Sequence, residues 1–446
     1  MKKLFGTDGM RGEAGIFPLD EETIFTVGQS LARQFREREG RTPRFVTGRD
    51  TRESGDWIEK AFHSGVCSEA GNVESAGVIT TPGVAFVTKA FEFDAGIVIS
   101  ASHNPFHDNG IKIFSPSGKK LDENTERMIE KDIFEAQKSP FRDHKLEIDS
   151  SRSNEYQSAY VDYLVKGFKK LALENFKMVI DCANGASSNL APQLFESLGA
   201  QIVAINCQPD GKNINENCGS LHLEKLQAKV LEEKADFGVA FDGDADRSLF
   251  VDEKGNLVDG DAVLWIMAQH LQEIGQLNDN TVVATVMSNI GLEVALNSKN
   301  IKLLRTAVGD KYVLEELLNS NSAVGGEQSG HIIFPNKSLV GDGMMTTLFL
   351  LESIQGKTFS NAVQGFTRFP QILVNVKVKE KKPFDEVAEI AEHAKKIESE
   401  LGANGRLLLR YSGTENLARV MIEGKNQAEI EAQAHHLAAV IKQSLN

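Results

Sequence analysis

Short apolar segments alternate with amphipathic helical stretches along the chain as far as Phe369. Six of the apolar segments predict strands, near residues 44–47, 96–99, 178–181, 237–241, 281–285 and 322–324. Strands that alternate with helices are typical of layered α/β domains. The alternation recurs three times, and each time a late strand runs into a polar loop. The pattern therefore predicts three similar α/β domains, related as weak repeats.

The pattern changes after Pro370. Residues 372–378 alternate between apolar and polar positions like a strand with one exposed face, and helical stretches follow at about 384–401 and 427–445. Further strands are predicted at 407–409 and 418–422. These elements predict an α+β domain at the carboxyl end. Taking polar stretches as boundaries, we expect four domains, at residues 1–152, 153–254, 255–369 and 370–446.

Composition narrows the class of protein. A chain of 446 residues is long for one hydrophobic core, and its 41% hydrophobic and 25% charged residues are those of an ordinary soluble globular protein. A formal net charge of -14 argues against nucleic acid or an anionic membrane as a partner. An anionic small molecule must therefore meet a local basic pocket.

The cysteines and the first residues bear on location. Four cysteines, at positions 67, 182, 207 and 218, form no C-x-x-C pair and are too few for a disulfide framework in a chain of this length. Lys2 and Lys3 precede only two apolar residues, so no signal-peptide core forms, and no apolar run approaches membrane-spanning length. We expect a cytoplasmic protein with reduced thiols.

The run from Gly96 to Pro105 delivers a serine onto a tight turn. Its apolar strand ends in Ser100-Ala101-Ser102-His103-Asn104-Pro105. Proline disfavours the helical conformation in the residue before it, so the turn cannot relax into a helix and Ser102 stays at the carboxyl edge of the strand. Ligands bind at that edge in open α/β sheets. An ordinary strand-to-turn junction is the alternative, and this segment alone does not exclude it.

A cluster of aspartates follows another predicted strand, where residues 235–241 run into Asp242-Gly243-Asp244-Ala245-Asp246-Arg247. Three carboxylates this close repel and raise one another's pKa unless a cation lies among them. Clustered oxygen ligands suit magnesium or calcium rather than zinc. An EF-hand is disfavoured, because Arg247 stands where its sharp turn needs glycine and a strand precedes the loop. The segment predicts a magnesium site, with a solvated acidic turn as the alternative.

A third polar loop lies in the predicted α+β domain. Residues 407–409 lead into Arg410-Tyr411-Ser412-Gly413-Thr414-Glu415-Asn416, and Arg419 stands in the strand that returns. Hydroxyl groups, a glycine-opened turn and flanking arginines are typical of an anion nest, in which backbone N–H groups point inward and guanidinium groups clamp phosphate oxygens. The alternative is a polar hairpin with surface arginines.

Five segments, in order, resemble the successive signatures of the α-D-phosphohexomutase family. They are Thr7-Asp8-Gly9-Met10-Arg11-Gly12, the Ser102 turn with Asp108-Asn109-Gly110-Ile111-Lys112, the triple-aspartate loop, Gly326-Glu327-Gln328-Ser329-Gly330-His331, and Arg410 to Glu415. Together they span nearly the whole chain, which makes them far more specific than any one alone. The family's last loop usually reads Ser-Gly-Thr-Glu-Pro, whereas Asn416 stands here in place of the proline. The resemblance implies four domains, three of them similar α/β units, around one central cleft.

The resemblance also implies roles for individual residues. Ser102 is expected to carry a phosphoryl group as phosphoserine and to complete a magnesium site with Asp242, Asp244 and Asp246. Charge on the transferring group would be stabilised by Lys112, Arg11 and Arg247, and the proton would be managed by Lys112 or His103. The ring hydroxyls of a sugar would be held by Glu327, Ser329 and His331. Its distal phosphate would be bound by Arg410, Ser412, Gly413, Thr414 and Arg419.

The implied reaction moves a phosphoryl group between O6 and O1 of a hexose, with the 1,6-bisphosphate as intermediate and activator. Within the family, the chain length and the glutamine at Gln328 most resemble the members that act on glucosamine phosphates. The resemblance therefore implies glucosamine 6-phosphate and glucosamine 1-phosphate as substrates, which would feed the synthesis of amino-sugar nucleotides and cell-wall precursors. The same chemistry on mannose or glucose phosphates is the alternative. A catalytically silent phosphosugar-binding protein is disfavoured, since Ser102, Lys112 and all three aspartates are present. A homodimer is one option for the assembly.

Overall fold

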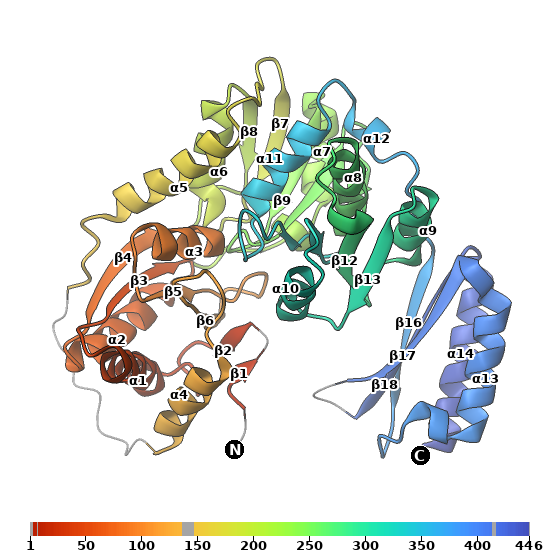
Figure 1. Cartoon of the computed structure of the whole chain (residues 1–446), viewed down its shortest axis with the longest axis horizontal. Helices are drawn as coiled ribbons and strands as arrows, with labels where there is room; N and C mark the ends of the chain where they lie inside the picture. The colour runs from red at the N-terminus through yellow and green to blue at the C-terminus, as the bar shows by residue number, and fades with distance from the viewer. Residues whose placement is uncertain (1–2, 7, 136–146, 413–415, 446) are drawn as a thin grey trace. The chain divides into compact units, whose positions relative to one another are not determined.

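The computed structural model describes residues 3–6, 8–135, 147–412 and 416–445. The chain separates into two compact units, one formed by Met1–Val286 with Leu304–Val363 and the other by Met287–Leu303 with Gln364–Asn446. Four sheets follow one another along the sequence (Figure 1). Among the described residues, we find no helix with the length and apolar character needed to cross a membrane.

The first sheet is mixed and has helices on both faces. Its strands are β1 (Phe5–Gly6), β2 (Gly9–Glu13), β3 (Arg44–Arg49), β4 (Asn72–Val78), β5 (Ala95–Ile99) and β6 (Asp108–Phe114), and its helices are α1 (Glu21–Glu39), α2 (Gly55–Ser68), α3 (Thr81–Ala90) and α4 (Glu123–Glu135). The strand order is β1-β2-β6-β5-β3-β4, with β3 parallel to β4 and β5. Thr47 hydrogen-bonds Glu59 of α2, while a Cβ on Gly48 would lie 2.4 Å from Val84 of α3. Successive strand residues point to opposite faces, so α2 and α3 cover opposite faces.

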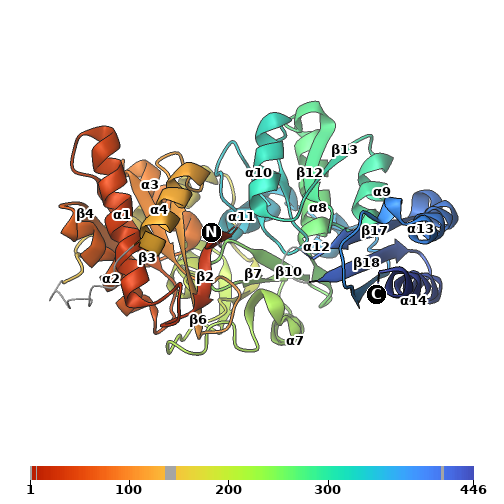
Figure 2. The ribbon, with the colours of Figure 1, turned by 90° about the horizontal axis from the view of Figure 1, so that it is seen from below.

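The second sheet repeats this plan with fewer strands. Its elements are α5 (Ser153–Gly167), β7 (Lys177–Asp181), α6 (Ser187–Ser197), β8 (Gln201–Ile205), η1 (Gly219–Leu221), α7 (Glu224–Glu233), β9 (Phe237–Phe241), β10 (Ser248–Asp252) and β11 (Leu257–Val258). The strand order is β11-β10-β9-β7-β8, and β7 runs parallel to β8 and β9. Helix α7 packs on β7, β9 and β10 (Figure 2). Because β11 pairs with β10, this sheet extends past residue 254, where we placed a boundary.

The third sheet has four strands in the order β13-β12-β14-β15. The elements of this part of the chain are α8 (Gly260–Glu273), η2 (Asn278–Asn280), β12 (Thr281–Thr285), α9 (Ile290–Ser298), β13 (Lys302–Thr306), α10 (Asp310–Asn319), β14 (Gly325–Gly326), β15 (Ile332–Ile333), α11 (Gly343–Ser353) and α12 (Phe359–Ala362). Strand β14 is parallel to β12 and antiparallel to β15.

The predicted strand at residues 322–324 is wrong, because the strand there is β14, at Gly325–Gly326. Two successive glycines are in general typical of a turn. In the structure they form a strand because the backbones approach closely: a Cβ on Gly325 would lie 2.7 Å from the Val283 carbonyl oxygen, and one on Gly326 would lie 2.5 Å from that of His331. The absence of a side chain is therefore a packing requirement at this position.

All three sheets contain the same hairpin, and the hairpin turns carry the polar loops. In each sheet a strand with a parallel neighbour is followed along the chain by an antiparallel partner, as β5 by β6, β9 by β10 and β14 by β15. The connecting segments hold Ser102, the three aspartates and Glu327. The prediction of three similar α/β layers, each sending a late strand into a polar loop, is confirmed.

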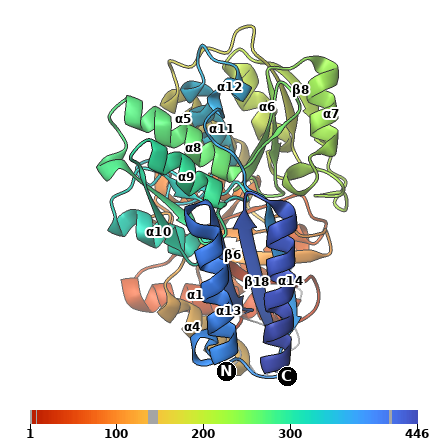
Figure 3. The ribbon, with the colours of Figure 1, turned by 90° about the vertical axis from the view of Figure 1, so that its right-hand side faces the viewer.

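The second compact unit is a layer of antiparallel strands with two long helices on one face. Its remaining elements are β16 (Gln371–Lys377), η3 (Phe384–Glu386), α13 (Ala388–Leu401), η4 (Gly402–Asn404), β17 (Gly405–Tyr411), β18 (Leu417–Gly424) and α14 (Gln427–Ser444). The order is β16-β18-β17, and α13 and α14 lie side by side against this sheet (Figure 3). The predicted α+β character is confirmed, although the helix expected from residue 384 starts as a separate 3₁₀ turn.

Candidate active site

Ser102 lies in the β5–β6 connection, fully buried and in a left-handed backbone conformation with φ of 54°. Its Oγ donates to Asp242 Oδ2 at 2.5 Å and lies 3.3 Å from His103 Nδ1. The predicted turn is present, since the Asn104 amide donates to the Ala101 carbonyl oxygen at 3.1 Å. The serine hydroxyl is therefore presented to the aspartate loop of the second sheet.

The three predicted aspartates come together in the β9–β10 turn. Asp242, Asp244 and Asp246 are all buried, and one carboxylate oxygen of each lies within 4.8 Å of the others. The Arg247 amide donates to Asp242 Oδ1 at 3.2 Å, and Thr81 Oγ1 donates to Asp244 Oδ2 at 2.6 Å. Burial raises the pKa of Asp242 well above its ordinary value, and the charges of Asp246 and Asp244 raise it further.

These oxygens suit a magnesium ion. Within the described part of the chain, Asp244 Oδ1 and Asp246 Oδ1 accept no hydrogen bond although both are buried. Buried carboxylate oxygens without a donor are costly, and a hard divalent cation with oxygen ligands satisfies them. Asp242, Asp244, Asp246 and an oxygen on Ser102 are the residues that would hold it.

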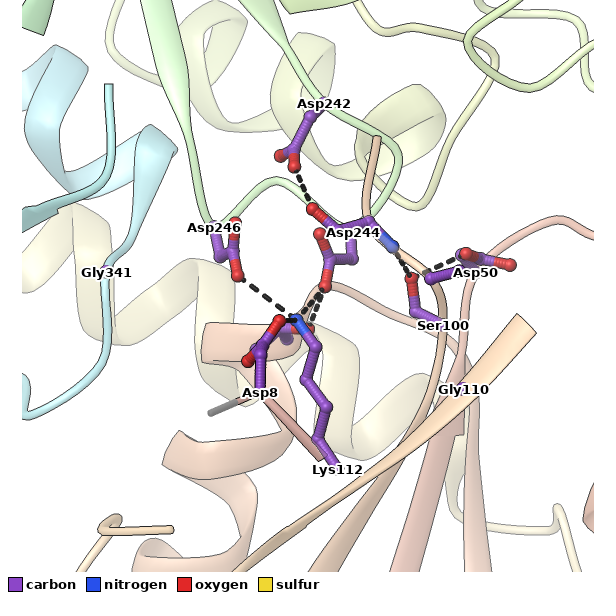
Figure 4. A network of polar contacts seen from close by, with 12 residues as sticks. Asp8, Asp50, Ser100, Gly110, Lys112, Asp242, Asp244, Asp246 and Gly341 are labelled. Atoms are coloured by element: carbon purple, nitrogen blue, oxygen red, sulfur yellow. Dashed lines mark hydrogen bonds and ion pairs between the residues drawn. The ribbon is translucent and has the colours of Figure 1, made fainter. Parts of the chain in front are cut away.

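Lys112 points from β6 toward the same cluster (Figure 4). Its Nζ lies 2.8 Å from Asp244, 3.2 Å from Asp246 and 3.2 Å from Asp8, and its side chain is 1% exposed. Burial lowers the pKa of Lys112, but these carboxylates raise it by more, so that it lies well above its ordinary value. In this arrangement Lys112 is an ammonium group that can stabilise negative charge.

Three further predicted residues lie around Ser102. Burial, together with Arg247 and Arg11, lowers the pKa of His103 to about 4, which leaves its ring neutral near neutral pH. Arg247 Nε lies 3.8 Å from Asp246 Oδ1. Arg11 forms an ion pair with Asp8 and donates to the Ala101 carbonyl oxygen at 3.5 Å. The structure therefore brings His103, Arg11 and Arg247 to the edge of the serine and aspartate loops.

The β14–β15 turn brings the predicted sugar-binding residues to this site. His331 is buried, with Nδ1 at 3.6 Å from Asp246 Oδ1, and its Nε2 lies 3.2 Å from the Gly341 amide nitrogen. Glu327 and Ser329 are half-buried, so both are open to a ligand. Glu327 Oε1 accepts from the Gly309 amide at 3.2 Å, which fixes the carboxylate against the start of α10.

A chain of ion pairs that the sequence did not reveal runs beside these groups. Lys120 Nζ lies 2.7 Å from Asp8 and 2.7 Å from Asp310, and Asp310 Oδ2 lies 3.9 Å from His331 Nε2. Burial raises the pKa of Asp8, but Lys112, Lys120 and Arg11 outweigh it, so the pKa falls below its usual range. Asp8 belonged to a recognised motif, yet Lys120 and Asp310 lie 190 residues apart, and no local pattern links them.

The described residues of the predicted anion nest belong to the second compact unit. Arg410 on β17 and Arg419 on β18 stand directly opposite in the antiparallel register, and both are half-buried. Burial lowers the pKa of Arg410, and the charge of Arg419 lowers it further. Like charges opposite each other destabilise a sheet, so an anion between them would be stabilising. Lys381 Nζ donates to the Ser412 carbonyl oxygen at 2.7 Å, adding an unpredicted cation, whereas Gly413 and Thr414 lie outside the described residues.

Four models of one protein family match the chain in order. They are described as phosphoglucomutase/phosphomannomutase alpha/beta/alpha domain I, at residues 2–140, domain II, at 158–255, domain III, at 259–369, and the C-terminal domain, at 373–440.

Two relatives named phosphoglucosamine mutase are similar over their full length. The protein of Solibacter usitatus (strain Ellin6076) is 47% identical over 446 residues, covering 100% of this chain and 99% of that one. The protein of Caldicellulosiruptor saccharolyticus is 48% identical over 452 residues, covering 100% of both chains.

Solved structures share the fold. A phosphoglucomutase/phosphomannomutase family protein from Burkholderia thailandensis has a TM-score of 0.78 at 22% identity, covering 100% of this chain and 99% of that one. N-acetylphosphoglucosamine mutase from Aspergillus fumigatus, in complex with GlcNAc-6P and magnesium, has a TM-score of 0.67 at 19% identity, covering 99% and 96%. With four matching family models and full-length relatives at 47% and 48% identity, the chain belongs to the phosphoglucomutase/phosphomannomutase family.

Proposed function

We propose that this protein is a phosphoglucosamine mutase, which interconverts glucosamine 6-phosphate and glucosamine 1-phosphate through a phosphoserine at Ser102 and a 1,6-bisphosphate intermediate. The observation that carries the proposal is the Ser102 hydroxyl, buried at 2.5 Å from Asp242 within a cluster of three aspartates and Lys112. The full-length similarity to relatives named phosphoglucosamine mutase supports this choice of substrate.

The proposed reaction exchanges a phosphoryl group between Ser102 and the sugar. The P–O bond to Ser102 Oγ breaks as a bond to the sugar hydroxyl oxygen forms. Of the two predicted proton carriers, Lys112 is already protonated, so the hydroxyl proton passes to the neutral ring of His103, whose Nδ1 lies 3.3 Å from Ser102 Oγ. The resulting bisphosphate then reorients in the site, and its other phosphoryl group is transferred to Ser102. Lys112, Arg11 and Arg247 stabilise the negative charge on the equatorial oxygens, which is where most of the catalysis of phosphoryl transfer arises.

A magnesium ion held by Asp242, Asp244, Asp246 and the phosphoserine would neutralise charge on the transferred group. The ring hydroxyls form hydrogen bonds with the side chains of Glu327, Ser329 and His331. Arg410, Ser412, Gly413, Thr414 and Arg419 bind the distal phosphate in either orientation of the sugar. All four cysteines are free thiols, in keeping with a reducing compartment, and we place the protein in the cytoplasm.

Measured on one preparation, kcat/KM for glucosamine, glucose and mannose phosphates tests the choice of sugar. We expect a clear preference for glucosamine phosphate with detectable turnover of glucose phosphate, because Glu327 can accept hydrogen bonds from ring hydroxyls of any hexose and a site without a dedicated partner rejects an isostere poorly. Ser329→Ala should change the ratio of the two without abolishing transfer. Faster turnover of glucose or mannose phosphate would overturn the substrate and leave the mutase chemistry standing.

Removing magnesium with a chelator is expected to abolish turnover. Asp244→Asn, which keeps the size of the side chain but removes a charged ligand, should weaken magnesium binding by about tenfold or more in a calorimetric titration of the purified protein. Asp252→Asn is the matched control: it lies at the other end of the β10 strand, is also buried, and accepts from the turn amides of Lys254 and Asn256. Turnover by metal-free wild-type protein would contradict the site.

Arg410→Ala is expected to raise the KM of both the 1-phosphate and the 6-phosphate by about ten- to a hundredfold, because charge-assisted hydrogen bonds to phosphate are lost. The variant should unfold at a temperature no lower than wild type, since the facing charge of Arg419 is relieved. Arg406→Ala on the same strand, whose guanidinium pairs with Glu423 at 2.7 Å, should show the reverse, with lower stability and unchanged KM. An effect of Arg410→Ala on one monophosphate alone would contradict reorientation of the intermediate.

A further inference from the structure

The loop that carries Ser102 closes around one buried guanidinium group, that of Arg52. Arg52 lies between β3 and α2, outside the segments that resembled a known family, and its side chain is 0% exposed. Its Nη2 donates to the carbonyl oxygens of Ser102 at 3.1 Å and Asn104 at 2.8 Å, and its Nη1 donates to those of Pro105 and, at 2.9 Å, Asp108. Four carbonyl groups of the loop therefore converge on one side chain.

The fifth donor of Arg52 is directed away from the loop. Its Nε donates to Asp50 Oδ2 at 2.9 Å, and its backbone amide donates to Asp50 Oδ1 at 3.0 Å. Ser100 Oγ donates to the same Asp50 Oδ2 at 2.6 Å and accepts from the Ser102 amide at 2.9 Å (Figure 4). A guanidinium group has five N–H donors in a fixed planar fork, and here each has an acceptor. The Ser102 amide and carbonyl are thus both anchored to the Asp50–Arg52 pair.

The connection between β8 and η1 adds a smaller anchor to the same two carbonyl groups. Asn215 Nδ2 donates to the carbonyl oxygens of Ser102 at 2.9 Å and Asn104 at 3.1 Å. A Cβ on Gly243, within the aspartate loop, would lie 2.5 Å from the Ser102 carbonyl oxygen, so the two loops are in direct backbone contact. Any shift of that carbonyl would move Ser102 against the aspartates.

These anchors explain how Ser102 keeps a backbone conformation that serine rarely adopts. A left-handed residue other than glycine persists only where its surroundings over-determine it. From this arrangement we infer that Arg52, fixed by Asp50 and assisted by Asn215, is a positioning residue for phosphoryl transfer: it holds the loop from Ser102 to Asp108 so that the Ser102 oxygen stays at the aspartate cluster. The inference rests on the proposed role of Ser102 as phosphoryl carrier.

Arg52→Lys tests the inference, because lysine keeps the charge beside Asp50 but cannot reach four carbonyl groups with one planar fork. We expect kcat per phosphorylated enzyme to fall by about ten- to a hundredfold, with KM for glucosamine 6-phosphate within about threefold of wild type. Hydrogen exchange at the amides of residues 100–108 should be faster, while exchange in β3 and β5 is unchanged. Arg49→Lys is the matched control, since Arg49 ends β3 and pairs with Glu59 and Asp56 but not with the loop.

Asn215→Ala is the second variant and removes one donor shared with Arg52. It should lower kcat by about three- to tenfold, and its effect should not add to that of Arg52→Lys, because both act on the same carbonyl groups. Wild-type kcat in Arg52→Lys, or a loss confined to KM, would overturn the inference. If Arg52→Lys does not fold, wild-type kcat and unchanged loop exchange in Asn215→Ala would overturn it. If wild-type protein carries no phosphoserine and turns over no sugar phosphate, the proposed function fails instead, and loop exchange still reports on the anchor.

Discussion

Replacing Ser102 with alanine is expected to lower turnover by at least about 10⁴-fold while the protein remains folded. The hydroxyl is the proposed phosphoryl carrier, and Ser100, the serine two residues before it, is committed to Asp50 at 2.6 Å and to the Ser102 amide. The fold should survive, because the substitution removes one hydrogen bond, to Asp242, at a cost of about 1 kcal/mol.

Three measurements on the Ser102→Ala variant check this prediction. Intact mass and peptide mass should show a phosphoryl group on the peptide that contains Ser102 in wild-type protein and none in the variant. The variant should unfold at the same temperature as Ser64→Ala, which removes a buried hydroxyl from α2, a helix that covers the first sheet. Ser64→Ala should leave turnover unchanged. Full turnover by uniformly unphosphorylated wild-type protein, with no bisphosphate added, would contradict the phosphoserine mechanism.

Much of the fold follows from local pattern. The strands predicted near residues 44, 96, 178, 237 and 281 are present, because short apolar runs bounded by polar turns are strong signals in buried sheets. The strand at Gly325–Gly326 was misplaced, since its existence depends on backbones from distant segments that approach too closely for a side chain. The pattern of apolar residues identifies strands that bury side chains. It does not identify a strand such as β14, which forms because its two glycines have no side chain.

In the candidate site, too, residues in local motifs could be predicted and residues placed by long-range contacts could not. Ser102, the three aspartates, Lys112 and His331 were found because each belongs to a compact motif, and the structure brings all of them together. The roles of Arg52, Asn215, Lys120 and Asp310 were missed. Arg52 contacts the loop across about fifty residues and Asn215 across more than a hundred, so their partners are set by strand order and hairpin register. The residues near the reacting atoms could be predicted from sequence motifs. The residues that hold them in place could be identified only from the structure.

Replacing Lys112 with methionine is expected to give the largest combined loss of stability and activity. The ammonium group is almost completely buried and contacts Asp8, Asp244 and Asp246, so its removal leaves Asp244 and Asp246 without their nearest positive charge. Breaking a buried ion pair from one side costs about 3–5 kcal/mol. Loss of a charge directed at the transferring group should lower kcat by about 10²–10³-fold in addition.

Lys120→Met is the control that separates the loss of a positive charge beside Asp8 from the loss of the positive charge at the aspartate cluster. Lys120 contacts Asp8 and Asp310, each at 2.7 Å, and its side chain is 22% exposed, whereas the side chain of Lys112 is 1% exposed and contacts the aspartate cluster. Removal of Lys120 should therefore cost less stability and far less kcat than Lys112→Met. Magnesium should raise the unfolding temperature of Lys112→Met by more than it raises that of wild type, because a divalent cation replaces the missing positive charge among the carboxylates. A Lys112→Met protein as stable as wild type without magnesium would show that these carboxylates do not need the ammonium group, and the electrostatic account of the cluster would be wrong.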